Sequence, residues 1–179
     1  MTKLNTELSM YLSKDDINNR LKEMANQLSE NFCNECPVII GILNGSFVFM
    51  ADLIRQIDFE CEIDFMKVNS YVGKETSGKV QLEKDININI KDRRVIIVED
   101  IIDSGLTMDY LHRHISTYNP KDITIVTLLS KKNKCTLNFN IDIVGFEITS
   151  EFVVGYGLDL DHRFRQLDSL YKLEPNILA

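Results

Sequence analysis

The sequence predicts an α/β fold in which a mostly parallel, Rossmann-like sheet is flanked by helices. Short runs of β-branched and other apolar residues alternate along the chain with segments of helical periodicity. The strand candidates are almost continuously apolar, which is typical of parallel strands that are buried on both faces. We find no internal repeat and no interdomain linker, so the 179 residues are expected to form one domain, residues 1–179.

The first part of the chain predicts a helix and then a strand–loop–helix unit. Ser13 is expected to cap a helix over residues 14–32, because acids crowd its first turn and apolar residues recur on one face. That face is formed by Ile17, Leu21, Met24, Leu28 and Phe32. The run VIIGIL (38–43) predicts a buried strand, and the segment after a tight NGS loop (47–57) predicts a helix.

The middle of the chain predicts a strand, a loop and a return strand. Residues 61–71 show partial alternation of apolar and polar side chains, which favours a strand. The polar, glycine-bearing residues 72–79 indicate a mobile loop, and residues 80–84 a possible return strand. The strictly alternating DININI (85–90) is short, and we interpret it as an edge segment or a connector.

The second half of the chain continues the strand–helix alternation. RRVIIVED (93–100) is the strongest strand candidate, and a helix is expected over residues 106–118, ended by an Asn-Pro pair. Three more strands are expected at 123–129, 141–148 and 152–156. Strands that alternate with helices in this way predict a parallel sheet.

Composition and charge exclude several classes of protein. The chain is 44% hydrophobic and 26% charged, with a formal net charge of −7, which argues against a broad surface for nucleic acid or anionic membranes. No apolar run approaches the roughly 18 residues that span a bilayer. The N-terminal residues lack the apolar core of a signal peptide, so a cytoplasmic protein is expected.

The stretch DSGLT (103–107) has the composition of a phosphate-binding loop that opens a helix. Gly105 permits a tight turn, while Ser104 and Thr107 offer hydroxyls beside free backbone N–H groups. These N–H groups and the helix dipole favour an anion. The stretch is neither a Walker loop nor a dinucleotide fingerprint, and on composition alone a plain helix N-cap remains the commoner explanation.

Two acids, Glu99 and Asp100, are expected at the end of the hydrophobic strand before this loop. Carboxylates accept hydrogen bonds from vicinal sugar hydroxyls and bind Mg²⁺ directly or through its waters. Ligands of open α/β sheets bind at the carboxyl ends of the strands, where GILNGSF (41–47) supplies a second loop. The sequence therefore predicts a site for a ligand with both a ribose and a 5′-phosphate.

The stretch VIIVEDIIDSGLT (95–107) closely resembles the phosphoribosyl diphosphate signature of type I phosphoribosyltransferases. Other segments, in their order and spacing, resemble the hypoxanthine–guanine phosphoribosyltransferase family over nearly the whole chain. They are GILNGSFVFMADL, SY (70–71), LLSKK, VGFEI, FVVGYGLD and FRQL. The resemblance implies a small hood built from the N- and C-terminal segments. It also implies purine salvage, in which phosphoribosyl diphosphate and hypoxanthine or guanine give IMP or GMP plus pyrophosphate.

The resemblance implies a role for each acid of the signature. Glu99 and Asp100 would hold the ribose hydroxyls, and together with Asp159 they would bind Mg²⁺, the implied cofactor. Asp103 would be the general base or acid at the purine nitrogen that becomes bonded to ribose, where a closed, water-poor site can raise a carboxyl pKa. The 5′-phosphate would be wrapped by Asp103, Ser104, Gly105, Leu106 and Thr107.

The resemblance also implies purine contacts. Lys131 would meet the exocyclic oxygen of a 6-oxopurine, Phe152 would stack on the base, and the backbone at Val153 would read its edge. Without the resemblance, the KKNK context of Lys131 favours a solvated basic loop, and Phe152 beside two valines favours a core position.

Pyrophosphate would be bound by Asn44, Gly45 and Arg165, and Ser70 and Tyr71 would belong to the mobile loop that closes over the reacting centre. Members of the family bind pyrophosphate largely through backbone groups beside an unusual cis peptide. Many of them have lysine where this chain has Asn44, so a positive charge is missing there. Without the resemblance, Asp159 and Arg165 are typical of ordinary surface charges.

Two alternative functions fit the same sequence. The first is a phosphoribosyltransferase that prefers xanthine or another base, since Lys131 and Phe152 do not separate the 6-oxopurines. The second is a non-catalytic, nucleotide-sensing regulator that binds RNA or DNA, which should show a concentrated basic face. The resemblance further implies a homo-oligomer, either a dimer or a tetramer.

Overall fold

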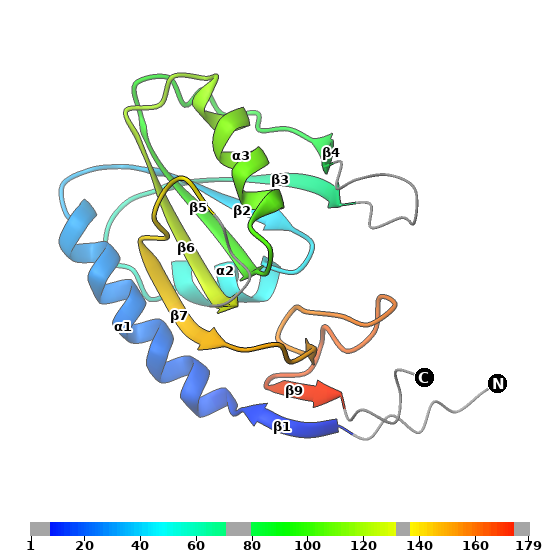
Figure 1. The fold of residues 1–179 in the computed structure, drawn as a ribbon. Helices are drawn as coiled ribbons and strands as arrows, with labels where there is room; N and C mark the ends of the chain where they lie inside the picture. The colour runs from blue at the N-terminus through cyan, green and yellow to red at the C-terminus, as the bar shows by residue number, and fades with distance from the viewer. Residues whose placement is uncertain (1–7, 71–79, 132–136, 174–179) are drawn as a thin grey trace.

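A six-stranded sheet in the order β4-β3-β2-β5-β6-β7 forms the centre of the molecule (Figure 1). The structure is a computed structural model that describes residues 8–70, 80–131 and 137–173. The strands are β2 (Val38–Leu43), β3 (Glu62–Ser70), β4 (Val80–Lys84), β5 (Arg94–Ile102), β6 (Asp122–Lys131) and β7 (Ile143–Ile148). All neighbouring pairs are parallel except β3 and β4, which are antiparallel. The predicted mostly parallel sheet is therefore confirmed.

Helices α1 (Lys14–Phe32) and α2 (Phe47–Ile54) cover one face of the sheet, and α3 (Leu106–Ser116) covers the other (Figure 1). The predicted cap at Ser13 is confirmed, because Ser13 Oγ accepts from Asp16 N at 3.2 Å and Asp16 Oδ2 accepts from Ser13 N at 3.1 Å. This reciprocal pair satisfies two N–H groups at the start of α1. Arg20 then ties α1 to β7 through hydrogen bonds to two backbone carbonyls of that strand.

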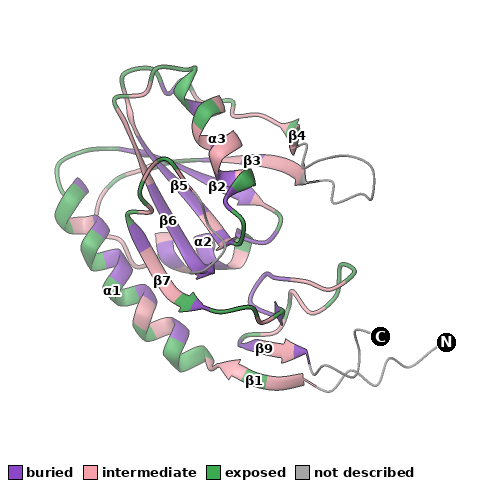
Figure 2. Cartoon of the chain, in the orientation of Figure 1, coloured by how far each residue is buried: buried purple, intermediate pink, exposed green. Residues whose placement is uncertain are grey.

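Two hydrophobic cores lie on the two faces of the sheet. Successive residues of a strand point to opposite faces, so β5 contributes to both cores. The core beneath α1 and α2 includes Leu21, Met24, Phe49, Ile96, Val98 and Leu128. The core beneath α3 includes Ile40, Val95, Ile97, Met108, Leu111 and Ile115. Figure 2 shows the central strands largely buried, while the outer side of α1 is exposed.

A separate three-stranded sheet, β1-β9-β8, forms the hood that the resemblance implies. Its strands are β1 (Leu8–Leu12), β8 (Val153–Val154) and β9 (Leu170–Leu173), all antiparallel. The sequence analysis did not predict β1 or β9. Both are short, and the residues of β1 are half-buried or exposed, so neither carries a clear alternation. The strand predicted over 152–156 shrinks to β8 and does not belong to the main sheet.

The bounds of α2 and β5 differ from those predicted, whereas segment 85–90 matches one of its two predicted interpretations. Helix α2 ends at Ile54 rather than at 57, and β5 continues past its two acids to Ile102. The segment 85–90 is a connector, held where buried Asp64 accepts hydrogen bonds from backbone N–H groups. Burial alone would raise the pKa of Asp64, but the hydrogen bonds outweigh it and lower the pKa to about 2.

Tyr71 and the predicted loop over 72–79 lie outside the described residues. Within the part of the chain that is described, no helix is both long enough and apolar enough to cross a membrane.

Candidate active site

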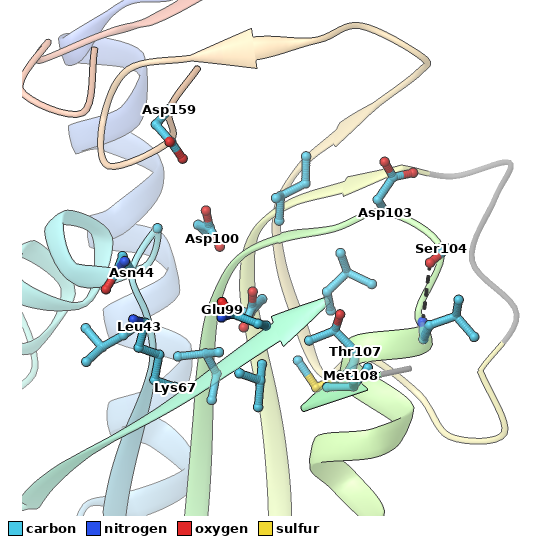
Figure 3. A pocket seen from close by; sticks show the side chains of 18 of the residues that line it. Leu43, Asn44, Lys67, Glu99, Asp100, Asp103, Ser104, Thr107, Met108 and Asp159 are labelled. Atoms are coloured by element: carbon cyan, nitrogen blue, oxygen red, sulfur yellow. Dashed lines mark hydrogen bonds between the residues drawn. The ribbon is translucent and has the colours of Figure 1, made fainter. Parts of the chain in front are cut away.

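A cavity of about 710 Å³ opens at the carboxyl edge of the sheet, between the ends of β2 and β5. Strands β3 and β5 lie on opposite sides of β2, so the strand order reverses at this point. Such a switch point is the usual ligand site of an open α/β sheet. The loops after β2 and β5 both line the cavity, together with the end of β3 and the loop after β8 (Figure 3).

Glu99 and Asp100 line the floor of the cavity from within β5. The sequence analysis placed them at the strand's end, whereas Ile101 and Ile102 still pair with β6. This correction means that the sheet itself holds the two acids in position. Among the described residues, the buried Oε2 of Glu99 has no hydrogen-bond partner. Burial, and then the neighbouring Asp100 carboxylate, raise the pKa of Glu99 well above its ordinary value.

Asp100 is buried, and burial raises the pKa of its carboxyl, although the positive charge of Arg165 opposes this rise. Two adjacent buried carboxylates are unfavourable without a cation or hydroxyl donors. The floor of the cavity is therefore arranged for a ligand that supplies such groups.

The loop after β2 lies directly against Asp100. A Cβ added to Gly45 would stand 1.8 Å from Asp100 Oδ2, so only glycine allows this approach. The Leu43–Asn44 peptide is cis, as the resemblance implies for the pyrophosphate loop. Ser46 closes the loop, since its buried Oγ donates to Ile42 O at 2.5 Å. The backbone of this loop is therefore placed beside the acid pair.

The loop after β8 reaches back to the same place. Gly157 has φ +99°, and a Cβ there would stand 2.1 Å from Gly45 O. Arg165 Nη1 donates to Gly157 O at 2.7 Å, and its Nη2 lies 2.6 Å from Asp159 Oδ1. Asp159 and Arg165 both line the cavity as an ion pair, so the interpretation as ordinary surface charges is wrong.

Residues 103–107 comprise the loop between β5 and α3 and the first two residues of α3, and they line the other side of the cavity. Gly105 is the N-cap of α3 in a left-handed conformation, and no side chain of the described residues makes a capping hydrogen bond at this end of the helix. Only a long hydrogen bond of 3.5 Å runs from Leu106 N to Ser104 Oγ (Figure 3). The plain N-cap interpretation is therefore wrong. The first N–H groups of a helix have no acceptor within it, so they are available to an anion here.

Asp103 and Lys131 form an ion pair at the cavity rim, with Lys131 Nζ 2.7 Å from Asp103 Oδ2. The pairing follows from the sheet, because Ile102 of β5 lies beside Ser130 of β6. The Lys131 side chain is only 10% exposed, so the interpretation as a solvated basic residue is wrong. The Asp103 side chain is 48% exposed, so the water-poor surroundings expected for it are absent from this conformation.

The other predicted purine contacts lie on the hood. Phe152 is 44% exposed, so the interpretation as a core residue is wrong, while Val153 is buried. Neither residue, nor Lys131, is among the described residues that line the cavity. Lys131 contacts Asp103, which does line the cavity. Ser70 ends β3, and Tyr71 lies outside the described residues.

Several cavity-lining residues were not predicted, most notably Lys67 and Asn69 of β3. Lys67 Nζ lies 2.7 Å from Glu83 Oε2, and Glu83 also accepts from Asn69 Nδ2. The sequence contained a signal for both residues. They are polar and lie at the carboxyl end of a predicted strand, which is the edge of the sheet where the pyrophosphate loop also lies. His162 and Met108 also line the cavity.

Comparison with known proteins agrees with this arrangement. A family model described as the phosphoribosyl transferase domain matches residues 8–161. The hypoxanthine-guanine phosphoribosyltransferase of Bacillus subtilis is 42% identical, over 94% of this chain and 94% of its own length. That of Aquifex aeolicus is 38% identical, over 94% of this chain and 96% of its own length. A crystal structure of a hypoxanthine-guanine phosphoribosyltransferase from Bacillus anthracis is 41% identical with a TM-score of 0.89, over 95% of this chain and 100% of that chain. The chain therefore belongs to the phosphoribosyl transferase family, and within it to the hypoxanthine-guanine phosphoribosyltransferases.

Proposed function

We propose that this enzyme transfers a 5-phosphoribosyl group reversibly from phosphoribosyl diphosphate to hypoxanthine or guanine, giving IMP or GMP and pyrophosphate. The contact between Asp103 and Lys131 carries the proposal. It joins the loop suited to a 5′-phosphate to a lysine suited to a purine oxygen, so Asp103 would lie between the sugar and the base. Purine salvage is the resulting role.

The sugar phosphate is proposed to lie across the strand switch point. Its 5′-phosphate would accept hydrogen bonds from the N–H groups at the start of α3, within residues 103–107, and from the hydroxyls of that loop. Its ribose hydroxyls would donate to Glu99 and Asp100, which supplies the unpartnered Oε2 with a donor. The diphosphate would lie against the backbone of Asn44 and Gly45, within reach of Arg165.

The purine is proposed to bind between the cavity rim and the hood. Lys131 would donate to the exocyclic oxygen, which favours 6-oxopurines over adenine because an amino group there offers no suitable acceptor. Exposed Phe152 would provide a stacking face, and the backbone at Val153 would hydrogen-bond the edge of the base. Lys131 must then exchange its present partner, Asp103, for the purine.

Asp103 is proposed to move the proton. As the bond from the anomeric carbon to the diphosphate oxygen breaks, the purine nitrogen bonds to that carbon and its proton passes to a carboxylate oxygen of Asp103. The carboxylates beneath the sugar would stabilise the positive charge that develops on it. Release of Asp103 from Lys131 when the purine binds frees the carboxylate as a base.

Magnesium is the cofactor that we propose. No three His, Cys, Asp or Glu side chains in residues 8–70, 80–131 and 137–173 form a metal site by themselves. Mg²⁺ is commonly held by one or two carboxylates together with substrate phosphates, so the unpartnered Glu99 oxygen and Asp100 fit it, with Asp159 as a further ligand. When bound, Mg²⁺ would neutralise charge on the diphosphate leaving group.

The test is a spectroscopic assay with phosphoribosyl diphosphate and Mg²⁺ against hypoxanthine, guanine, xanthine and adenine in parallel. We expect turnover of hypoxanthine and guanine, and at least about a hundredfold lower kcat/KM for adenine, since a site built to bind an oxygen rejects its replacement strongly. Turnover of xanthine alone would favour the alternative base specificity. No turnover of any base, with binding of IMP retained, would favour a nucleotide-sensing regulator.

We further propose that the enzyme is a cytoplasmic homo-oligomer, either a dimer or a tetramer. The naming of its relatives as purine phosphoribosyltransferases supports a soluble metabolic enzyme. Light scattering coupled to size-exclusion chromatography tests the assembly, and a mass of one chain, 20.6 kDa, would contradict it.

A further inference from the structure

We propose that Lys67 supplies the positive charge at the diphosphate end of the cavity. This inference rests on the proposed function, because it assigns a residue to the diphosphate of the substrate. Four acids line the cavity, namely Glu99, Asp100, Asp103 and Asp159. Among the described residues that line it, the lysines and arginines are Lys67 and Arg165.

Arg165 is already committed to other partners. Its two terminal nitrogens are bonded to Gly157 O and to Asp159, at 2.7 and 2.6 Å. An arginine paired with an aspartate contributes little net charge to a ligand. A diphosphate carries several negative charges, and Asn44 in the loop beside it is neutral. Lys67 is the other cation among the described lining residues, and its ion pair with Glu83 is more exposed than that of Arg165 with Asp159.

The sheet places Lys67 beside the loop after β2. Strands β2 and β3 are parallel, and Lys67 pairs in register with Leu43, the last residue of β2. Side chains that are paired in this way point to the same face of a sheet. Figure 3 shows Lys67 next to Leu43 and on the same side of the cavity as Asn44, away from Ser104 and Thr107. This is the end opposite to the proposed 5′-phosphate.

The present partner of Lys67 is easily exchanged. Lys67 Nζ lies 2.7 Å from Glu83 Oε2, and each of the two side chains is 35% exposed. Ion pairs with this exposure contribute little to stability, since solvent screens them. A lysine has three donors on a flexible stem, so Lys67 can turn to the diphosphate. Glu83 then keeps its hydrogen bond from Asn69.

The experiment measures pyrophosphate binding by calorimetry in the presence of Mg²⁺, and the KM values of both substrates. We expect Lys67→Ala to weaken pyrophosphate binding about tenfold, as expected for the loss of one partly screened charge-assisted contact. The KM of phosphoribosyl diphosphate should rise similarly, while the KM of hypoxanthine stays within about twofold. Lys67→Arg should keep most of the affinity, because it retains the charge.

Two further variants separate local charge from net charge. Lys121→Ala removes one exposed lysine that is paired with Glu35 away from the cavity, and it should leave pyrophosphate binding unchanged. Asn44→Lys in the Lys67→Ala background should restore affinity, since the two positions adjoin the same end of the cavity. Melting temperatures of all variants report any loss of folding.

Unchanged pyrophosphate affinity in Lys67→Ala would overturn the inference, and so would an equal loss in Lys121→Ala. If the proposed function were wrong, these experiments would give a different set of results. In that case the unaltered enzyme would turn over no purine, while the calorimetric dependence on Lys67 would still be measurable.

Discussion

Replacing Asp103 by asparagine separates a chemical role from a structural one. The side chain keeps its size and its ability to accept a hydrogen bond from Lys131, but it can no longer take a proton. The Asp103 side chain is 48% exposed, so solvent partly screens its ion pair with Lys131, but the Lys131 side chain is only 10% exposed and would lose its counter-charge. The free energy of unfolding should therefore fall by about 1–3 kcal/mol.

The effect on catalysis should be much larger. General acid–base catalysis contributes about 10²- to 10⁴-fold, so kcat should fall by that factor in Asp103→Asn. Each tenfold loss corresponds to about 1.4 kcal/mol of activation free energy, which makes the expected loss about 3 to 5.5 kcal/mol. Steady-state kinetics with hypoxanthine gives the first quantity, and urea denaturation gives the stability.

Asp168→Asn is the matched control. Asp168 forms an exposed ion pair with Lys14, at 3.7 Å, and it does not line the cavity between β2 and β5. The same chemical change there should alter kcat by less than about twofold, because an exposed pair away from the reacting atoms contributes little. A fall in kcat of less than about tenfold in Asp103→Asn would refute the proton-transfer role, because general acid–base catalysis is worth more than that.

Three other predictions test the diphosphate loop, the fold and the base site. Gly45→Ala places a Cβ 1.8 Å from Asp100 Oδ2, so it should lower stability by about 1–3 kcal/mol and raise the KM of phosphoribosyl diphosphate. Gly41→Ala also crowds buried side chains, but it should leave that KM unchanged; equal KM values for the two variants would contradict the assignment. The depressed pKa of Asp64 stabilises the fold above about pH 4, and this stability of about 2 kcal/mol is lost as the pH falls from 4 towards 2. Urea denaturation at pH 3 and pH 5 should show a larger loss in the unaltered protein than in Asp64→Asn, in which other carboxyls with lowered pKa values, such as that of Glu151, still become protonated. Phe152→Ala should raise the KM of hypoxanthine about tenfold without changing that of phosphoribosyl diphosphate, since stacking contributes about 1–3 kcal/mol per base; no change in either KM would exclude the stacking role.

The sequence was sufficient to predict those helices and strands whose pattern lies within their own residues. Helix α1 shows its apolar face and its capping serine directly, and β2, β5 and β6 each contain a run of largely apolar, β-branched residues. The strands of the hood give no such signal. Strand β1 pairs with β9, from the other end of the chain, and a short half-exposed strand is stabilised by that distant pairing rather than by its own pattern.

For the candidate site, too, contacts between residues that are close in the sequence could be predicted, whereas contacts between distant segments could not. The acids and the phosphate loop are contiguous in the sequence, so their proximity could be predicted. The contact between Gly45 and Gly157, the ion pair between Asp159 and Arg165, and the place of Lys67 beside the cavity all depend on how distant loops meet. Sequence patterns alone assigned Arg165 to the surface, because the residues next to it in the sequence do not show that a distant loop packs against it.

Hydrogen–deuterium exchange with IMP tests the central claim most directly, since it locates the nucleotide without relying on turnover. We predict that IMP slows exchange of the backbone N–H groups at the start of α3, in residues 104–108, because the 5′-phosphate accepts hydrogen bonds from them. The segment 117–121, at the opposite end of α3, should exchange at an unchanged rate. Protection at residues 104–108 that rises with IMP concentration is the predicted result, whereas saturating IMP with no protection there would contradict the account.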